Sequence, residues 1–244
     1  MWMLLHGFTG SPKSWDLVAE ELSRNDAVLR PHILGHGPDW RDRHVATFEA
    51  EVGRLAALAK TMPEPRYLCG YSMGARLALG LLARAVPGFD GAVLIGAHPG
   101  LTRDDERAAR REVDAERSAL LRRGGTDAFV AAWETNPLFA SQSKLPEPTR
   151  VRQREIRTSH DPEGLATALE ILGLAEMPDF TPDLPELRPP SIWVAGGLDD
   201  KFSAIAGAAT PHPHIVEGVG HNVVLEHPSA VVSILKSMER GTYE

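Results

Sequence analysis

The chain has 244 residues, of which 43% are hydrophobic and 24% charged, and its formal net charge is −7. These values are typical of a globular protein with one large core, and the negative charge gives no overall attraction to nucleic acid or to an anionic membrane. The one cysteine, Cys69, excludes an internal disulfide framework, and no apolar run reaches the roughly 18 residues of a membrane-spanning helix. Residues 1–5 are apolar but lack the basic start of a signal peptide, so we expect a cytoplasmic protein with no membrane insertion.

Predicted strands and helices alternate along the first hundred residues. Apolar patterns predict buried strands at residues 2–5, 27–33, 66–69 and 91–95, and helices at 14–22, 47–59 and 75–85. Such alternation predicts an α/β fold, with a mainly parallel sheet covered by helices on both faces. Functional sites in these sheets lie at the carboxyl ends of the strands.

The pattern changes after residue 99. Residues 103–123 contain seven arginines and six acidic residues without a strand pattern, helical segments continue to about residue 174, and a proline-rich link follows at 178–190. Strand patterns resume at 192–195 and 214–216, and a closing helix is predicted at 229–239. We therefore expect a core of residues 1–99 and 184–244, interrupted by a helical lid segment of residues 100–183.

The segment Gly70-Tyr71-Ser72-Met73-Gly74 has the G-x-S-x-G pattern of a nucleophile elbow. A predicted strand precedes it and a predicted helix follows it, which is the context that the elbow requires. The glycines supply positions without a Cβ atom, so that the strained turn can form and the helix can pack close to the strand. Ser72 is therefore the candidate nucleophile or base; the alternative is an ordinary strand-to-helix turn in a non-catalytic protein.

A serine hydroxyl needs a neighbouring base, normally a histidine held by a carboxylate. In this type of fold the chain order is Ser, then acid, then His. His221 follows the last predicted strand in a glycine-rich turn, and it is the candidate base. Asp199 and Asp200 follow the preceding strand; adjacent side chains point in different directions, and we favour Asp199 as the acid.

An anion that forms near Ser72 needs preorganised donors. The backbone N–H of Met73 is one candidate, and that of Phe8, in the loop after the first predicted strand, is the second. His6 and His36 are interpreted as structural residues, with a place in the pocket wall as the alternative for His36. No clustered Cys, His or Asp pattern indicates a metal, and no nucleotide-binding motif follows the first strand, so we expect neither a metal nor a cofactor.

The elbow, the His-Gly loop and the Ser–Asp–His order together resemble the α/β-hydrolase superfamily over nearly the whole chain. The resemblance implies an α/β-hydrolase fold with a helical lid, and the strands predicted for this chain make a sheet of about six. Members usually carry two further strands before the His-Gly loop, whereas five residues precede His6 here. Either those strands are missing, which leaves a sheet edge that needs cover, or the recorded start is late.

Within the superfamily, further motifs resemble the 2-succinyl-6-hydroxy-2,4-cyclohexadiene-1-carboxylate synthase family of menaquinone biosynthesis. An arginine stands four residues after Ser72, and the lid segment has an arginine-rich helix after residues 98–101. Other matching motifs are Asn136-Pro137-Leu138-Phe139, Asp199-Asp200-Lys201-Phe202 and Gly220-His221-Asn222. The chain departs at residues 32–37, where His-Ile-Leu-Gly-His-Gly replaces the usual Asp-x-Pro-Gly-His-Gly.

This resemblance implies a lyase that eliminates pyruvate from an anionic enolpyruvyl cyclohexene substrate, with the Ser–His–Asp triad supplying the base and no acyl-enzyme. Arginine suits carboxylates because its planar fork donates two parallel hydrogen bonds. The substrate-binding residues that the resemblance implies are Tyr71, Arg76, Arg110, Trp133 and Arg157. The alternative for the arginine-rich helix is a solvated face with i,i+4 ion pairs, which we favour for Arg107, Arg111, Arg117 and Arg122. Trp133 fits the lid core equally well.

Two rival functions fit the same sequence. One is a carboxylesterase or C–C bond hydrolase that uses the triad through an acyl-enzyme; the other is a non-catalytic ligand receptor on a hydrolase fold. An anionic small molecule is the expected partner in the lyase interpretation, and the chain is expected to be a monomer or a small homo-oligomer.

Overall fold

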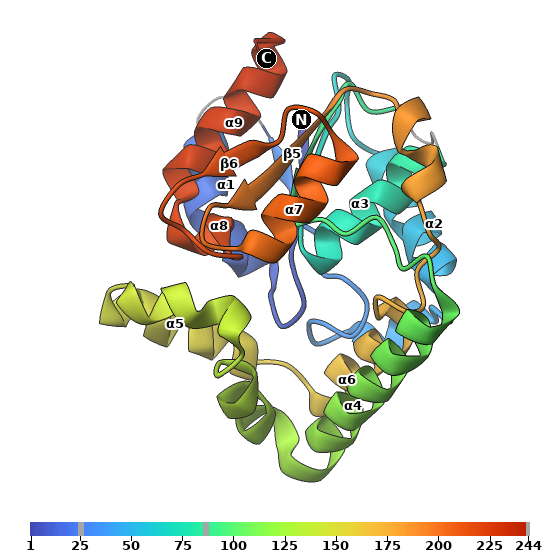
Figure 1. Cartoon of the computed structure of the whole chain (residues 1–244), viewed down its shortest axis with the longest axis vertical. Helices are drawn as coiled ribbons and strands as arrows, with labels where there is room; N and C mark the ends of the chain where they lie inside the picture. The colour runs from blue at the N-terminus through green and yellow to red at the C-terminus, as the bar shows by residue number, and fades with distance from the viewer. Residues whose placement is uncertain (24–26, 85–87, 243–244) are drawn as a thin grey trace.

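The computed structural model describes residues 1–23, 27–84 and 88–242. Six parallel strands form one sheet in the order β2-β1-β3-β4-β5-β6 (Figure 1). Their bounds are β1 Trp2–Leu5, β2 Val28–Leu29, β3 Tyr67–Tyr71, β4 Gly91–Ile95, β5 Ser191–Gly196 and β6 His214–Val216. Leu5 pairs with Gly70 and Tyr71 with Ile95, so the carboxyl ends of the central strands meet at one edge. The predicted six-stranded parallel sheet is confirmed.

Alternate residues of the strands pack against two separate helical layers. Met3 and Leu5 belong to one core cluster and Trp2 and Leu4 to another, because successive side chains of a strand point to opposite faces. One face is covered by α2 (Phe48–Ala59), α3 (Met73–Ala83) and α7 (Asp200–Ala209); α1 (Asp16–Ser23), α8 (Val223–Glu226) and α9 (Pro228–Arg240) cover the other. The sequence did not predict α7 or α8, and residue 85 of the predicted helix 75–85 lies outside the described residues.

Strand β2 is shorter than the predicted strand at 27–33. Pro31 has no N–H to donate to a ladder. The carbonyl of His32 instead accepts hydrogen bonds from Arg43 and Arg54, and the N–H of Leu34 donates to a side chain of α2. Because these backbone groups bond to side chains and not to β1, the chain leaves the sheet before the loop of residues 35–37.

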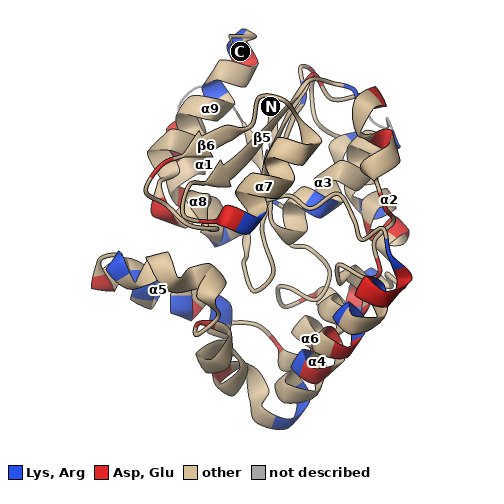
Figure 2. Ribbon diagram, viewed as in Figure 1, with Lys and Arg blue, Asp and Glu red and all other residues tan. Residues whose placement is uncertain are grey.

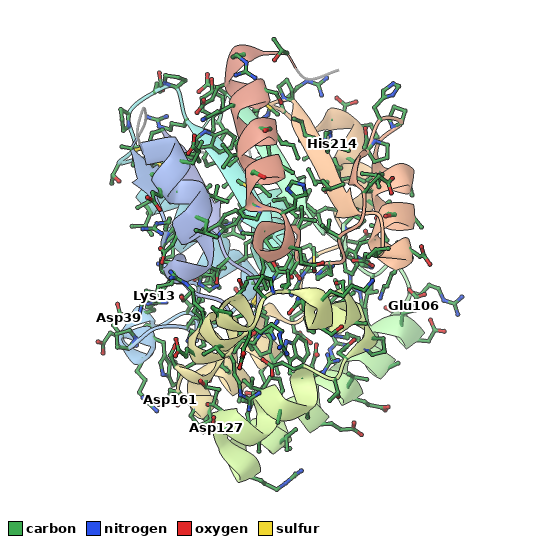
Figure 3. The ribbon with its side chains drawn as sticks, turned by 90° about the vertical axis from the view of Figure 1, so that its left-hand side faces the viewer. Lys13, Asp39, Glu106, Asp127, Asp161 and His214 are labelled. Carbon is green, nitrogen blue, oxygen red and sulfur yellow. The ribbon has the colours of Figure 1, made fainter. Side chains whose placement is uncertain are left out.

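The helices of the lid segment lie beyond the carboxyl edge of the sheet. They are α4 (Asp104–Trp133), the 3₁₀ helix η3 (Pro137–Lys144), α5 (Glu147–Thr158) and α6 (Pro162–Leu172). In Figure 3, His214 at the start of β6 lies on the side away from these helices, whereas Asp127 of α4 and Asp161, which directly precedes α6, lie on their side. The division into core and lid stays a prediction, and the arrangement in Figure 1 is consistent with it.

Helix α4 is long and is bent at Gly125, whose φ of 73° is one that glycine adopts readily. It packs against α6 through Leu121, Phe129 and Leu165, which belong to a small apolar cluster of their own. The first two thirds of α4, residues 104–123, carry many acidic and basic residues (Figure 2). None of the described helices is long and apolar enough to cross a membrane.

Candidate active site

Ser72 stands at the turn between β3 and α3 in a conformation that side chains rarely adopt. Its φ is 53° and its ψ is −109°, and its N–H donates to the carbonyl of Ile95 over 2.8 Å. A Cβ atom at Gly70 would lie 2.4 Å from the carbonyl oxygen of Gly74, and one at Gly74 would lie 2.2 Å from that of Leu5. The predicted strand–turn–helix context and the need for both glycines are thus confirmed.

His221 lies between Ser72 and an aspartate. Its Nε2 is 3.1 Å from the Ser72 hydroxyl oxygen, and its Nδ1 is 2.7 Å from a carboxylate oxygen of Asp199. The other oxygen of Asp199 accepts the N–H of Phe202, which fixes the carboxylate at the start of α7. Asp200 is exposed. The structure therefore joins Ser72, His221 and Asp199 in one hydrogen-bonded row, as a proton relay requires.

Aromatic rings hold the His221 imidazole in place. Phe202 lies 4.3 Å from it and Tyr71 5.4 Å, between ring centroids. Burial raises the pKa of the Tyr71 hydroxyl above its usual range. Residue Gly96, with φ of 58°, faces the imidazole edge at the end of β4.

A cavity of about 370 Å³ opens next to Ser72 and His221. Its wall includes six more of the residues predicted for the site, namely Phe8, Tyr71, Met73, Arg76, Arg110 and Trp133. Phe8 and Met73 are the two predicted oxyanion donors. The cavity lies between the carboxyl ends of the strands and the lid segment, as expected for an α/β sheet.

Arg76 is buried at the inner wall of this cavity. Its exposed fraction is 7%, and its guanidinium donates to the carbonyl of Leu172 over 2.7 Å. Burial, with a smaller effect of Arg110, lowers the pKa of Arg76 to about 9. Among the described residues, no carboxylate lies within salt-bridge distance of Arg76. An anionic ligand in the cavity could therefore pair with the Arg76 guanidinium without displacing a protein carboxylate.

Two arginines of α4 share the buried carboxylate of Asp114. The Nε of Arg110 lies 2.7 Å from one oxygen, and the Nη1 of Arg117 lies 3.0 Å from the other. Both arginines line the cavity. The sequence analysis assigned Arg117 to a solvated face, and this interpretation is wrong because Arg117 lines the cavity. Arg110, Asp114 and Arg117 recur at i, i+4 and i+7, a spacing that puts them on one face of a helix.

Lys201 and His98 are two further cavity residues that the sequence analysis did not assign. Lys201 stands in the first turn of α7, two residues after Asp199. Burial lowers the pKa of His98 to about 4, and the nearby charges of Lys201 and Arg76 act in the same direction. The part of the wall built from described residues thus carries four cationic side chains and no carboxylate.

The alpha/beta hydrolase family model matches residues 3–234 of this chain. The chain belongs to the alpha/beta hydrolase family. It is 33% identical to the 2-succinyl-6-hydroxy-2,4-cyclohexadiene-1-carboxylate synthase of Citrobacter koseri, over 98% of this chain and 94% of that protein. It is 34% identical to the enzyme of the same name from an Enterobacter species, over 98% and 92%. These identities place it, as an enzyme, in the synthase family within the superfamily.

Solved structures show the same relationship. The structure of MenH from S. aureus superposes with a TM-score of 0.92 at 27% identity, covering 99% of this chain and 93% of that one. A thermophilic esterase from Thermogutta terrifontis superposes with a TM-score of 0.82 at 25% identity, over 100% and 90%. The resemblance to the superfamily and to the synthase family that the motifs indicated is therefore confirmed.

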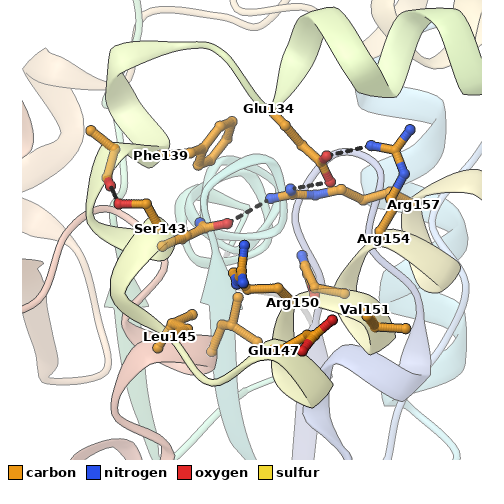
Figure 4. A pocket seen from close by; sticks show the side chains of 13 residues that line it. Glu134, Phe139, Ser143, Leu145, Glu147, Arg150, Val151, Arg154 and Arg157 are labelled. Carbon is orange, nitrogen blue, oxygen red and sulfur yellow. Dashed lines mark hydrogen bonds and ion pairs between the residues drawn. The ribbon is translucent and has the colours of Figure 1, made fainter.

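Arg157 of this synthase-family chain does not line the cavity that holds Ser72. It is 3% exposed, and its guanidinium bonds Glu134 at 3.0 Å and the side-chain oxygen of Gln142 at 3.1 Å. It also lies over the ring of Phe139, which has Trp133 and His221 as further ring neighbours. Figure 4 shows Arg157 and Arg154 reaching Glu134 at a neighbouring pocket of about 390 Å³. Its role as a substrate ligand stays a prediction.

His6 and His36 hold the loops behind the site. The Nδ1 of His6 donates to the carbonyl of Gly7 and its Nε2 accepts the N–H of Ile33, while the Nε2 of His36 accepts the N–H of Thr9. Burial lowers the pKa of His6 to about 3, so the ring is neutral. Neither lines the cavity. Among residues 1–23, 27–84 and 88–242, no cluster of three or more His, Cys, Asp or Glu side chains could hold a metal.

Proposed function

We propose that this enzyme is a lyase that eliminates pyruvate from an enolpyruvyl-bearing succinyl cyclohexene carboxylate and releases 2-succinyl-6-hydroxy-2,4-cyclohexadiene-1-carboxylate. The observation that carries the proposal is the joining of a Ser–His–Asp row to four cationic side chains in one cavity: Arg76, Arg110, Arg117 and Lys201. A protein of net charge −7 needs such a local excess of positive charge to hold a polycarboxylate. The names of the related synthases support the same product.

In the proposed reaction the Ser72 oxygen removes a ring proton. The Nε2 of His221 takes the hydroxyl proton of Ser72, and Asp199 stabilises the imidazolium that forms. The electrons of the broken C–H bond form the new ring double bond, and the bond from the ring to the enolpyruvyl oxygen breaks. The departing enolate takes up one proton, which balances the proton that the His221 imidazolium gives back, and becomes pyruvate. The N–H groups of Phe8 and Met73 are the proposed donors to the developing negative charge.

Residues 100–183 are proposed to act as a lid over this reaction. Arg110, Arg117 and Trp133 all come from α4, yet they line the same cavity as Ser72 from the core. A lid that carries substrate-binding groups excludes water when the substrate is bound.

Pyruvate release tests the proposal. Purified enzyme is given the enolpyruvyl substrate, and pyruvate is followed with a coupled lactate dehydrogenase assay. Wild-type enzyme is expected to release pyruvate, whereas Ser72→Ala is expected to be inactive while keeping its thermal melting temperature. Absence of release by folded wild-type enzyme, or equal release by Ser72→Ala, contradicts the lyase.

A carboxylesterase is the second candidate, because the fold is similar to that of a thermophilic esterase and a Ser–His–Asp row can also support nucleophilic acyl transfer. It predicts covalent labelling of Ser72 by a fluorophosphonate and a burst of alcohol release from a neutral ester. Rapid turnover of such an ester without pyruvate release favours the esterase. Slow ester turnover beside fast pyruvate release favours the lyase.

A further inference from the structure

The buried carboxylate of Asp114 is the centre of an arginine pair that faces the cavity. Its exposed fraction is 5%, and each of its two oxygens accepts from a different arginine, Arg110 over 2.7 Å and Arg117 over 3.0 Å. One carboxylate thus fixes two guanidinium groups that stand two helical turns apart. A guanidinium has five N–H donors, and within the described chain each of these two gives only one of them to a protein oxygen.

Arg117 is fixed from a second side by an aromatic ring. Its Cζ lies 5.0 Å from the centroid of Trp133, within the range of a cation–π contact. Trp133 is itself stacked on Phe129 at 5.6 Å and meets the edge of Phe8 at 5.5 Å. The guanidinium is therefore held in a set orientation rather than free to swing into solvent, which lowers the entropy cost of using it to bind a ligand.

The charges at this end of the cavity do not balance. Asp114 is the carboxylate that Arg110 and Arg117 share, and buried Arg76 adds a third guanidinium close enough to be affected by Arg110. Burial, followed by the neighbouring charge of Arg110, also lowers the pKa of Arg117. Mutual repulsion of this kind is relieved when an anion occupies the space between the guanidinium groups.

We propose that Arg117 is a substrate-binding residue, that it forms with Arg110 a carboxylate-binding edge on α4, and that Asp114 is the positioning residue for both. The ligand class is a dicarboxylate, one of whose carboxylates binds this edge while the other reaches Arg76 of the core, which lines the same cavity. The inference rests on the proposed function in that it uses the same cavity, but it assigns a residue that the family resemblance did not supply.

The test measures binding without turnover. Isothermal titration calorimetry with 2-succinylbenzoate, a stable aromatic dicarboxylate, is compared with its succinyl-side methyl ester, which has one charge fewer. Arg117→Ala is expected to raise the Kd of the dicarboxylate about tenfold or more, as expected for one charge-assisted hydrogen bond, and to change that of the ester much less. Arg117→Lys is expected to recover only part of the loss, because an ammonium lacks the planar fork.

Arg111→Ala is the matched control. It removes the same charge from the same helix, but Arg111 is exposed and pairs with Glu176. Its Kd is expected to stay within about twofold of wild type, since exposed charges are screened. Equal effects of Arg111→Ala and Arg117→Ala overturn the proposal, as does wild-type protein that binds the diacid and the ester equally.

Asp114→Asn tests whether Asp114 positions the two arginines or acts only through its charge. The change removes one negative charge beside the cavity, so a purely electrostatic role of Asp114 predicts tighter dicarboxylate binding. A positioning role predicts weaker binding, because the two guanidinium groups lose their shared anchor. Tighter binding overturns that part of the proposal. Dicarboxylate binding that depends on Arg117, without pyruvate release, would support the proposed subsite and contradict the lyase. Pyruvate release together with binding that does not depend on Arg117 would contradict the subsite alone.

Discussion

A Cβ atom at Gly96 would lie 2.8 Å from Cε1 of His221, the imidazole that bonds Ser72. Gly96 directly follows β4 and has a φ of 58°, a conformation that residues with a Cβ rarely adopt. The glycine thus leaves room for the imidazole at the distance that Ser72 needs. The geometry of the proposed relay depends on a residue that takes no part in it.

Gly96→Ala is expected to push the imidazole away from Ser72. Because misplacement of a catalytic group by about 1 Å costs on the order of 10²-fold in rate, kcat is expected to fall by about that factor while KM changes little. Gly207→Ala, in open space on α7, is the control and is expected to leave kcat unchanged. Steady-state kinetics of pyruvate release measures both; a wild-type kcat in Gly96→Ala refutes the steric role.

Ser72→Gly is expected to give an inactive but more stable protein. The strained backbone of Ser72 costs on the order of 1 kcal/mol or more in a residue with a Cβ atom, and glycine adopts positive φ without that cost. Urea denaturation is expected to give a free energy of unfolding about 1 kcal/mol higher than that of Ser72→Ala, which keeps the Cβ. A lower value for the glycine variant would show that no strain is stored at the elbow.

Asp199→Asn and Asp200→Asn separate two adjacent carboxylates. Asp199 accepts from the Nδ1 of His221, whereas Asp200 is exposed at the start of α7. Loss of the Asp199 charge is expected to lower kcat by about 10²–10⁴-fold, because the imidazolium loses its stabilising partner. Asp200→Asn is expected to leave kcat within about twofold. Steady-state kinetics of pyruvate release measures kcat for both variants, and similar values would exclude Asp199 as the acid.

The buried histidine His160 is expected to make the fold sensitive to acid. Burial lowers its pKa to about 4, below the value of about 6.5 in an unfolded chain. Between pH 6.5 and 4 the unfolded state therefore binds more protons, so the free energy of unfolding falls as the pH falls, by up to about 1.4 kcal/mol per pH unit for this residue. Below pH 4 its contribution no longer changes.

His160→Gln is expected to reduce that slope, while His212→Gln, at an exposed position, serves as the control. Urea unfolding at pH 6.5, 5.5 and 4.5 gives the slopes. Burial lowers the pKa of His6 to about 3, and this residue is still present in His160→Gln. Part of the dependence of the unfolding free energy on pH is therefore expected to remain. Identical slopes in His160→Gln and wild type would show that His160 does not stay neutral in the folded protein.

Arg110→Ala and Arg157→Ala are expected to fail in different ways. Arg110 lines the cavity, and its loss is expected to raise KM by a factor equivalent to about 1.5–3 kcal/mol with little change in kcat. Arg157 is buried between Glu134 and Gln142, and its loss is expected to lower the free energy of unfolding by about 1–3 kcal/mol. Kinetics and urea unfolding of both variants test this; a raised KM at wild-type stability for Arg157→Ala would restore its role as a substrate ligand.

The sequence by itself determined the sheet and the row of Ser72, His221 and Asp199. Apolar runs with glycine-rich turns mark buried strands, and the elbow pattern lies between a predicted strand and a predicted helix, the context that it requires. The sequence also favoured Asp199 over Asp200, and the 2.7 Å contact with His221 agrees with that choice. The strand predicted at 27–33 is longer than β2, because an apolar pattern does not reveal that the side chains of Arg43 and Arg54 donate to the carbonyl of His32.

Only the tertiary structure decided which arginines face the cavity. The segment of residues 103–123 has seven arginines and six acidic residues, and its charge pattern does not distinguish an arginine in an exposed ion pair from one that faces a ligand site. Arg117 lines the cavity and Arg157 does not, because the packing of α4 on α6 and of Phe139 against Arg157 sets the direction of each side chain. Long flexible side chains take their direction from tertiary neighbours, whereas a backbone elbow is fixed by its own glycines.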